Sequence, residues 1–446
     1  MKPLRHRGLA TVAQFVAAVS FVAAWQSLGS PLSADDWPQW RGPARDGAWN
    51  ETGLIERFDG PEVPIRWRMP IASGYSGPTV ADGRVYVTDR LVEPKPLERV
   101  HCFDAETGRA LWRHEYEAAY DGIGYTAGPR ASVLVNDGRA YSLGAAGHLH
   151  CFDAAEGRVL WRKDLREEYK VRMPDWGITA APVVEGDRLI VMIGGEDACV
   201  VAFDRRTGEE RWTALSDRAT YSAPIVIDQA GRRVLVCWAA ERIVGLDPAT
   251  GKLHWEFPFH WEKWPIAIAT PVAHGDLLLF SEVHKGTLLL RTLADRLAVE
   301  EVWHQRAEDD GDAPALHCLM STPFIRDGHI YAADKEAVLR CLDLEAGRHL
   351  WEDESAGPRQ RWGTIHLVRN ADRVWLFNEL GELIIARLTP RGYDEISRAK
   401  LIAPTTDQLR RREGVTWSHP AFADRHVYAR NDKELVCGDL SAAADR

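Results

Sequence analysis

The segment Cys102-Phe-Asp-Ala-Glu-Thr-Gly-Arg-Ala-Leu-Trp112 decides the fold, because its pattern recurs along the chain. In every clear copy an Asp is followed four residues later by a Gly and eight residues later by a Trp. The other clear copies span residues 151–161, 202–212, 245–255 and 341–351. An Asp accepts hydrogen bonds from the backbone just after it, and a Gly adopts the left-handed conformation that a tight turn needs. Each copy therefore predicts a β-hairpin.

A second predicted pair of strands precedes each hairpin, as in Pro78-Thr-Val-Ala-Asp-Gly-Arg-Val-Tyr-Val. Four strands in a unit of roughly 45 residues match the size of a propeller blade. Strands such as 189–193 and 234–238 are apolar on both faces, which is expected when each sheet is covered by two others. The Trp falls in the outermost strand, where we expect its indole to pack on the neighbouring unit.

Counting the units predicts an all-β, eight-bladed β-propeller of four-stranded antiparallel blades. Two units are degenerate: the one at 288–303 lacks the Asp and the Gly, and the one at 383–396 has an aliphatic residue in place of the Trp. The last unit, from Pro420 to Leu440, stops after three strands. We expect the strand around Trp67 to supply the fourth and close the ring. A seven-bladed ring with one aberrant insertion is the alternative.

The first residues of the chain have the layout of a secretory signal. Residues 1–34 combine a basic start, an apolar run from 9 to 25 and small residues before Asp35. We expect an exported protein, periplasmic or secreted, without stable membrane insertion once the signal is cleaved. An uncleaved membrane anchor is the alternative, because the apolar run approaches the roughly 17 residues that can span a bilayer. The expected parts are a signal peptide at 1–34, an N-terminal extension at 35–63, one propeller domain at 64–440 and a tail at 441–446.

The charge of the chain limits its partners. Its formal net charge is −10, and the basic residues are spread thinly apart from a short run at 410–412. A protein of this charge repels polyanions, so we expect neither nucleic acid nor an anionic membrane surface as a partner. We expect a monomer.

The seven Cys have positions that argue against disulfides. Cys102, Cys151, Cys341 and Cys437 each lie two residues before an Asp, so they occupy one equivalent site in four different units. Equivalent sites on separate blades are too far apart for the roughly 5.5 Å between Cα atoms that a disulfide needs. We expect small, buried, unpaired side chains.

The repeated hairpin resembles the signature of the PQQ-like propeller repeat, named after pyrroloquinoline quinone, over residues 67–440. This resemblance takes in the PQQ-dependent alcohol dehydrogenases, which are enzymes, and BamB, the outer-membrane assembly factor, which is a non-catalytic protein-binding propeller. It therefore implies the fold without implying the cofactor. The lipid-attachment Cys expected by analogy with BamB is missing, because no Cys precedes Cys102.

The quinoprotein enzymes combine an adjacent Cys pair over the cofactor, a Glu, Asn and Asp set on calcium, and a catalytic Asp. This chain has no adjacent Cys pair, and no such set can be placed at matching positions. We therefore assign no catalytic, cofactor-binding or metal-binding residue and expect no cofactor. PQQ with calcium lacks support in the sequence.

The candidate site is a set of rings, one in each segment that leads from an outer strand to the next inner strand. These residues are Tyr75, Tyr125, Trp176, Tyr221, Trp264, His317, Trp362 and Trp417. They either pack each connecting segment onto its blade or form a rim at the mouth of the channel that stacks on a sugar, a planar ring or a peptide. Candidate polar contacts, with a solvated surface position as the alternative for each, are Asp89, Arg90, Arg130 and His419.

These features predict a non-catalytic exported propeller that binds a protein or a small ligand at the channel mouth. The alternatives are a PQQ-dependent oxidoreductase acting on alcohols or sugars, and a propeller that binds glycans.

Overall fold

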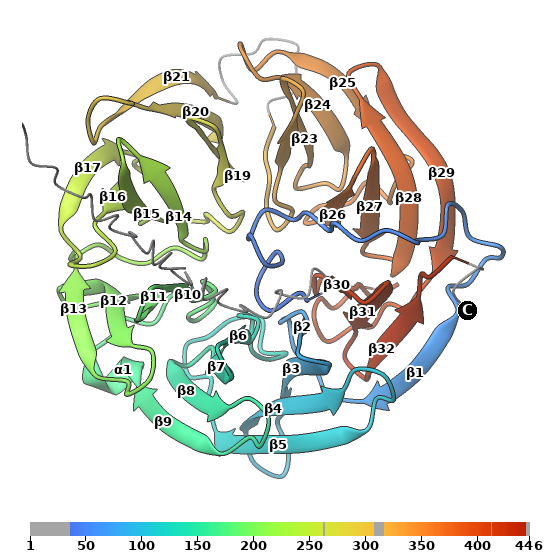
Figure 1. Ribbon diagram of the computed structural model, residues 1–446, viewed down its shortest axis with the longest axis horizontal. Coiled ribbons are helices and arrows are strands. Elements are labelled where there is room, and N and C mark those ends of the chain that lie inside the picture. Colours follow the sequence, from blue (N-terminus) through green and yellow to red (C-terminus); the bar gives the residue numbers. More distant parts are fainter. Residues whose placement is uncertain (1–35, 262–263, 307–315, 412, 443–446) are drawn as a thin grey trace, which may run out of the picture. The chain divides into compact units, whose positions relative to one another are not determined.

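The computed structural model describes residues 36–261, 264–306, 316–411 and 413–442. Its strands form eight four-stranded antiparallel sheets arranged in a ring (Figure 1), so the predicted eight-bladed β-propeller is confirmed. The one helix of the described residues is the short α1 (Leu165–Glu168).

Each blade runs from an innermost strand at the channel to an outermost strand at the outer edge of the ring. Blade 1 consists of β2 (Thr79–Ala81), β3 (Arg84–Leu91), β4 (Leu97–Asp104) and β5 (Ala110–Glu117), and blade 2 of β6 (Leu134–Asn136), β7 (Arg139–Leu143), β8 (His148–Asp153) and β9 (Val159–Asp164). Blade 3 consists of β10 (Val183–Glu185), β11 (Arg188–Gly195), β12 (Ala198–Asp204) and β13 (Glu210–Ala214), and blade 4 of β14 (Ile225–Gln229), β15 (Arg232–Trp238), β16 (Arg242–Leu246) and β17 (Leu253–Pro258). Blade 5 consists of β18 (Val272–His274), β19 (Leu277–Glu282), β20 (Gly286–Thr292) and β21 (Val299–Gln305), and blade 6 of β22 (Phe324–Arg326), β23 (His329–Ala333), β24 (Leu339–Asp343) and β25 (His349–Asp353). Blade 7 consists of β26 (Ile365–Asn370), β27 (Arg373–Asn378), β28 (Glu382–Thr389) and β29 (Gly392–Lys400), and blade 8 of β30 (Ala421–Ala423), β31 (His426–Arg430), β32 (Glu434–Asp439) and β1 (Ile65–Pro70).

The ring is closed by strands from the two ends of the repeat region. Strand β1 pairs antiparallel with β32, and Trp67 lies opposite Cys437 in the register. The N-terminal strand therefore completes the last blade, as the sequence predicts. Strand β1 covers the outer edge of β32, which would otherwise be unpaired.

Blades are joined by an indole that lies on the turn of the next blade. The Trp67 Nε1 donates to the Ala105 carbonyl at 2.9 Å, and the Trp112 Nε1 donates to the Ala154 carbonyl at 3.0 Å. A Cβ atom added at Gly157 would lie 2.4 Å from the Trp112 ring. The glycine is therefore required both for its φ of +72° and for the space that the indole fills. The same arrangement recurs with Trp67 on Gly108, Trp161 on Gly208, Trp212 on Gly251 and Trp303 on Gly347.

The degenerate fifth blade changes this contact at its boundary with blade 4. It lacks the Asp and Gly turn, so the Trp255 Nε1 donates instead to the Gln229 Oε1 of its own blade at 2.9 Å. The Gln229 Nε2 in turn donates to the Ala298 carbonyl of blade 5 at 2.7 Å. One glutamine thus carries the link between blades that a turn carries elsewhere.

The seven Cys are all buried and unpaired, as expected. Burial raises the pKa of Cys102 and Cys151 to about 12, so these thiols stay protonated and unreactive at neutral pH.

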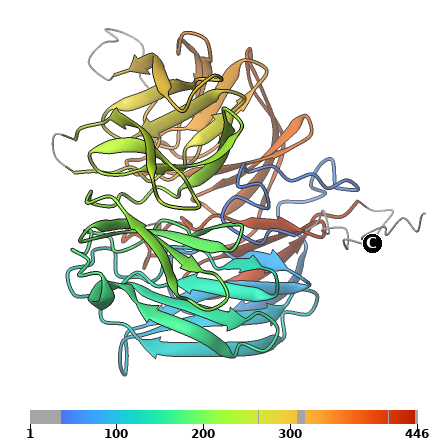
Figure 2. The same cartoon turned by 60° about the vertical axis from the view of Figure 1, so that its left-hand side comes forward.

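The N-terminal extension runs from the centre of the ring to its outer edge beside β29 (Figures 1 and 2), and we call its first part, residues 36–51, the strap. Trp37 pairs through its backbone with Val80 of blade 1, and Trp49 donates its backbone N–H to Arg369 of blade 7. The Arg45 guanidinium donates to the carbonyls of Pro182 and Pro224, at the entrances to blades 3 and 4. The strap is thereby bonded to blades far apart in the sequence.

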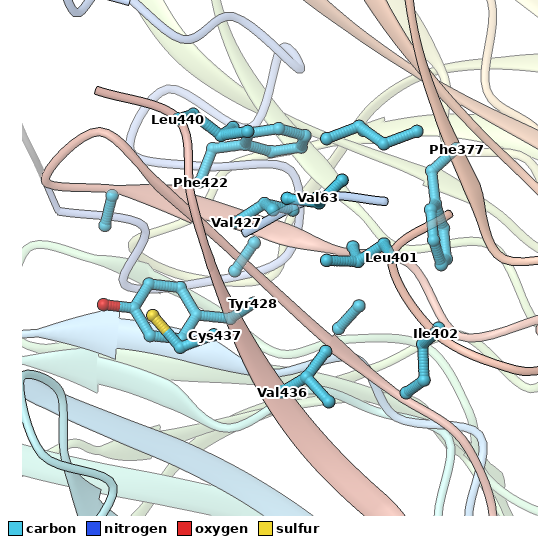
Figure 3. Packing of buried hydrophobic residues seen from close by; sticks show 14 of the residues in the cluster. Val63, Phe377, Leu401, Ile402, Phe422, Val427, Tyr428, Val436, Cys437 and Leu440 are labelled. Carbon is cyan, nitrogen blue, oxygen red and sulfur yellow. The ribbon is translucent and has the colours of Figure 1, made fainter. Parts of the chain in front are cut away.

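The extension also adds to the core at the closing blade. Trp37, Trp49 and Val63 belong to one buried apolar cluster with residues of β30 to β32, and Figure 3 shows Val63 beside Val427. Burial of apolar surface contributes roughly 25 cal/mol per Å² removed from water, so this packing stabilises the point where the two chain ends meet.

The contact between indole and glycine predicts the effect of two matched substitutions in blade 2. Gly157→Ala and Gly138→Ala both place a Cβ at a positive φ, which costs about 1–2 kcal/mol. Only Gly157 faces an indole, because a Cβ at Gly138 meets nothing within 4 Å. We expect Gly157→Ala to lower the free energy of unfolding by about 1–3 kcal/mol more than Gly138→Ala does, measured by denaturant titration. Equal losses in the two variants would show that the indole does not press on this turn.

Candidate functional site

An open cup with a volume of about 290 Å³ lies at one end of the central channel. Seven of the eight predicted rings line it: Tyr75, Tyr125, Trp176, Tyr221, Trp264, Trp362 and Trp417. We call this surface, with the other residues that line it, the aromatic cup. Arg130, one of the predicted polar contacts, also lines the cup. The sequence does not single out the other lining residues, which are Thr179, Ile266, Ile268, His284, Leu319, Met320 and Arg361.

The rings contact one another around part of the cup. The ring centroids of Trp176 and Tyr221 lie 4.8 Å apart, and those of Tyr125 and Trp417 lie 6.0 Å apart. Trp417 is buried, whereas Trp264 is 60% exposed and Tyr125 is 40% exposed. Some rings therefore pack the connecting segments, and others present a free aromatic face to solvent.

His317 does not line the cup, so its expected place at the rim is wrong. The residue sits where blades 5 and 6 meet, and its carbonyl accepts a hydrogen bond from the Lys335 backbone N–H at 2.7 Å. Burial lowers the pKa of His317 to about 4. The aliphatic side chains of Leu319 and Met320, two and three residues later, line the cup in its place.

Two rings of the cup, the exposed Tyr125 and the half-buried Trp362, are held in a backbone conformation that large residues rarely adopt. Tyr125 has a φ of +53° and Trp362 a φ of +63°. Such a conformation costs on the order of 1–3 kcal/mol and persists only where the surroundings enforce it. Strain of this kind is concentrated at functional sites, which supports a role for both rings beyond packing.

An arginine enforces each strained conformation by holding carbonyl groups. The Arg130 guanidinium donates to the carbonyls of Gly124 at 2.7 Å and of Tyr125 at 2.6 Å. Arg411 donates to the carbonyl of Arg361 and, at 2.7 Å, to the buried carboxylate of Glu379. Arg411 belongs to the basic run at 410–412, and this contact with the Trp362 segment gives one residue of the run a structural role.

The charged side chains that line the cup are two arginines, so the charge of the lining is positive. Arg130 lies 4.9 Å from the centroid of the Tyr75 ring, and Arg361 lies 4.5 Å from that of Trp362. Burial raises the pKa of Tyr221 to about 12 and raises that of Tyr75 as well, so both phenols are neutral. No carboxylate belongs to the lining among the described residues.

Asp89 and Arg90 are neither cup residues nor solvated surface residues, so both expectations for them are wrong. Asp89 is fully buried and accepts hydrogen bonds from Arg99 at 2.7 and 2.6 Å. Burial alone would raise the pKa of Asp89, but the hydrogen bonds from His101 and Arg99 outweigh it and hold the pKa well below its usual range. The Arg90 guanidinium stacks on Tyr120 at 3.9 Å. Asp89 is thus paired inside blade 1, and the Arg90 guanidinium contacts the segment that leads to blade 2, where it donates to the Thr126 carbonyl at 2.9 Å.

His419 is also buried, and it lies deeper than the cup. A chamber of about 120 Å³ continues below the cup, and its lining includes His419 and Trp40 of the strap. The His419 Nε2 lies 2.7 Å from the Ser132 Oγ, and the Trp40 Nε1 donates to the Thr270 Oγ1 at 2.7 Å. The two rings meet edge to face at 4.4 Å. The strap thus contributes Trp40 to the wall of the channel below the cup.

Comparison with known proteins places this architecture among propellers of one repeat type. A family model described as outer membrane protein assembly factor BamB matches residues 97–260. Two curated relatives carry the same description: one from Moranella endobia is 26% identical over 44% of this chain and 50% of its own length, and one from Bordetella pertussis is 22% identical over 69% of this chain and 72% of its own length. The chain is a PQQ-like β-propeller.

Solved structures show the same fold for this PQQ-like propeller. BamB from Moraxella catarrhalis has a TM-score of 0.58 at 14% identity, covering 84% of this chain and 99% of that one. A quinohemoprotein alcohol dehydrogenase from Comamonas testosteroni has a TM-score of 0.62 at 14% identity, covering 92% and 81%. At these identities the likeness shows the fold alone. The match to the Moranella protein spans only half of that relative's length.

The described residues of the PQQ-like propeller contain no helix long and apolar enough to cross a membrane. The predicted signal peptide at 1–34 lies outside the described residues.

Buried histidines predict how the stability of this PQQ-like propeller depends on pH. Burial lowers the pKa of His150 and His419 to about 3 and that of His366 to about 4. Unfolding returns each to an ordinary pKa of about 6.5, so below that pH the unfolded chain binds protons that the folded chain does not. Stability should therefore fall as the pH decreases from about 6.5 to 4, by up to about 1.4 kcal/mol per pH unit for each histidine.

A substitution at His150 isolates one of these contributions. His150 stacks on Phe152 and lies 4.5 Å from Tyr116, so His150→Phe keeps an aromatic ring in the cluster and removes the titrating group. We expect the variant to lose less stability than the parent between pH 6.5 and 4, measured by denaturant titration at each pH. Parallel pH profiles would contradict the neutral state of His150 in the folded protein.

Proposed function

We propose that this PQQ-like propeller is a non-catalytic, exported binding module that holds a partner protein at the aromatic cup. The observation that carries the proposal is the cup itself, a cavity lined by aromatic rings of which two, Tyr125 and Trp362, are fixed in strained conformations by arginines. The relatives support the partner's class, because they are described as factors of outer membrane protein assembly. Exposed apolar surface of this kind marks sites of interaction in soluble proteins.

The residues present do not fit a calcium-bound quinone. Calcium requires about six to eight oxygen ligands, mostly from carboxylates and carbonyls. The described lining of the cup offers two arginines and no carboxylate, and the described residues contain no group of three or more His, Cys, Asp and Glu placed to hold a metal. The Cys residues are dispersed and buried rather than adjacent. The proposal therefore includes no step that involves PQQ.

A glycan also suits the cup less well than a protein does. Sugar recognition combines a flat ring with several free hydrogen-bonding groups. Here the Tyr75 hydroxyl already donates to the Gln408 carbonyl at 3.0 Å. Arg130 already donates three hydrogen bonds to backbone carbonyls. Trp264 lies mostly exposed at the lip, which extends the contact surface beyond the cavity. An occupant larger than the cavity fits this arrangement.

Photo-crosslinking in the cell envelope of the source organism tests the proposal. We expect a photoreactive phenylalanine at position 264 to give a discrete protein adduct, because this position faces any partner seated in the cup. The same residue at position 350, which is 37% exposed on the outer strand β25, should give none. The adduct at 264 should be lost in Trp362→Ala and kept in Leu253→Ala, whose side chain is exposed on β17.

Two outcomes would contradict this proposal. One is an adduct that forms equally at 264 and 350, or that survives Trp362→Ala. The other is a quinone absorbance that stays with the protein after PQQ and calcium are added and removed by desalting, together with reduction of a dye by alcohols or sugars.

A further inference from the structure

The aromatic cup has two unlike sides. Tyr75 and Arg130 come from the segments that enter blades 1 and 2, and they form a polar side. Ile266, Leu319 and Met320 come from the segments that enter blades 5 and 6, which lie across an eight-membered ring from the first pair. Ile266 and Leu319 form a small buried apolar cluster with Val283, against which Met320 and the rim tryptophans pack. A ligand that fits both sides is itself apolar at one end and polar at the other.

The cup is lined by two arginines that form no ion pair among the described residues: Arg130 on the polar side, and Arg361 in the segment that enters blade 7. Neither Arg130 nor Arg361 has a carboxylate within 4.0 Å among the described residues, although the chain as a whole carries a net charge of −10. Arg130 uses three of its five N–H groups on backbone carbonyls, and the others have no partner in the described part of the chain. A guanidinium is the donor best suited to a carboxylate.

The long-range charge of the protein does not cancel this local preference. The Debye length is about 8 Å at physiological ionic strength, so distant acidic residues are largely screened from a group inside the cup. The arginines in the wall act on their occupant at contact distance. Charge complementarity therefore favours an acidic group in the cup even though the protein is acidic.

We infer that the cup binds an aromatic or leucine-like side chain of a partner polypeptide that has an Asp or Glu beside it. The apolar side chain would lie against Ile266, Leu319 and Met320, and the carboxylate would face Arg361, whose segment is next to that of Leu319 and Met320 in the ring; Arg130 would add positive charge from the polar side. This inference rests on the proposed function and adds the chemistry of the anchor. Trp264, at 60% exposure on the lip, would contact the polypeptide on either side of that anchor.

Selection from a phage library of random peptides on the immobilised full chain tests the inference. We expect the enriched peptides to carry an aromatic residue or Leu next to Asp or Glu, and to bind less well to Trp264→Ala. Arg361→Gln should weaken the best peptide by about tenfold, the loss expected for one charge-assisted hydrogen bond. Arg109→Gln is the matched control, because Arg109 is also exposed but lies on the outer hairpin of blade 1, and it should have no effect.

A charge reversal excludes misfolding as the explanation. On Arg361→Glu, the selected peptides should carry Lys or Arg beside the apolar anchor in place of an acid. Peptides that depend on Trp264 but show no acidic preference, and whose binding Arg361→Gln leaves unchanged, would overturn this inference while leaving the binding function standing. Failure to enrich any peptide that depends on Trp264 would overturn both.

Discussion

The contact between an outer-strand tryptophan and the glycine turn of the next blade is the interaction on which the rest of the structure depends. The indole fills the space that a Cβ would occupy at Gly108 or Gly157, and its Nε1 reaches a carbonyl of the same turn. An aromatic side chain of this size buries about 150–250 Å², so each contact supplies a large part of a boundary between blades. Trp67 makes the same contact from the N-terminal strand, and this is what joins blade 8 to blade 1.

A ring built in this way places its connecting segments at equal distances around one axis. The segments then present side chains to the same mouth, and an aromatic residue repeated in seven of them forms most of a rim. The strap places Trp40 in the channel below this rim, while Arg130 and Arg411 fix the strained segments at Tyr125 and Trp362. The cup is thus prepared before any partner arrives, which lowers the entropy lost on binding.

The sequence predicts the features that repeat and misses those that do not. The fold, the closing strand and seven of the eight cup rings follow from a fixed spacing, which is a local signal. Trp40 belongs to no repeat, so nothing in the sequence places it in the channel. The role of Asp89 depends on the antiparallel register that sets it opposite Arg99. A residue close in sequence to a mouth segment can therefore form an ion pair inside its blade instead of lining the mouth. Only the pairing of β3 with β4 shows this for Asp89.

The exchange of backbone amide hydrogens at the mouth tests the claim of a preformed cup most directly. The Gly124 N–H donates to the Asp175 carbonyl at 2.7 Å, and the Gly363 N–H donates to the Lys335 carbonyl at 3.0 Å, so both tie a rim segment to its neighbour. In the free protein these two amides should exchange about as slowly as those of the blade strands β7 and β27. Exchange at the rate of an unstructured loop would show that the rim is not held in place, and the account of the cup would be wrong.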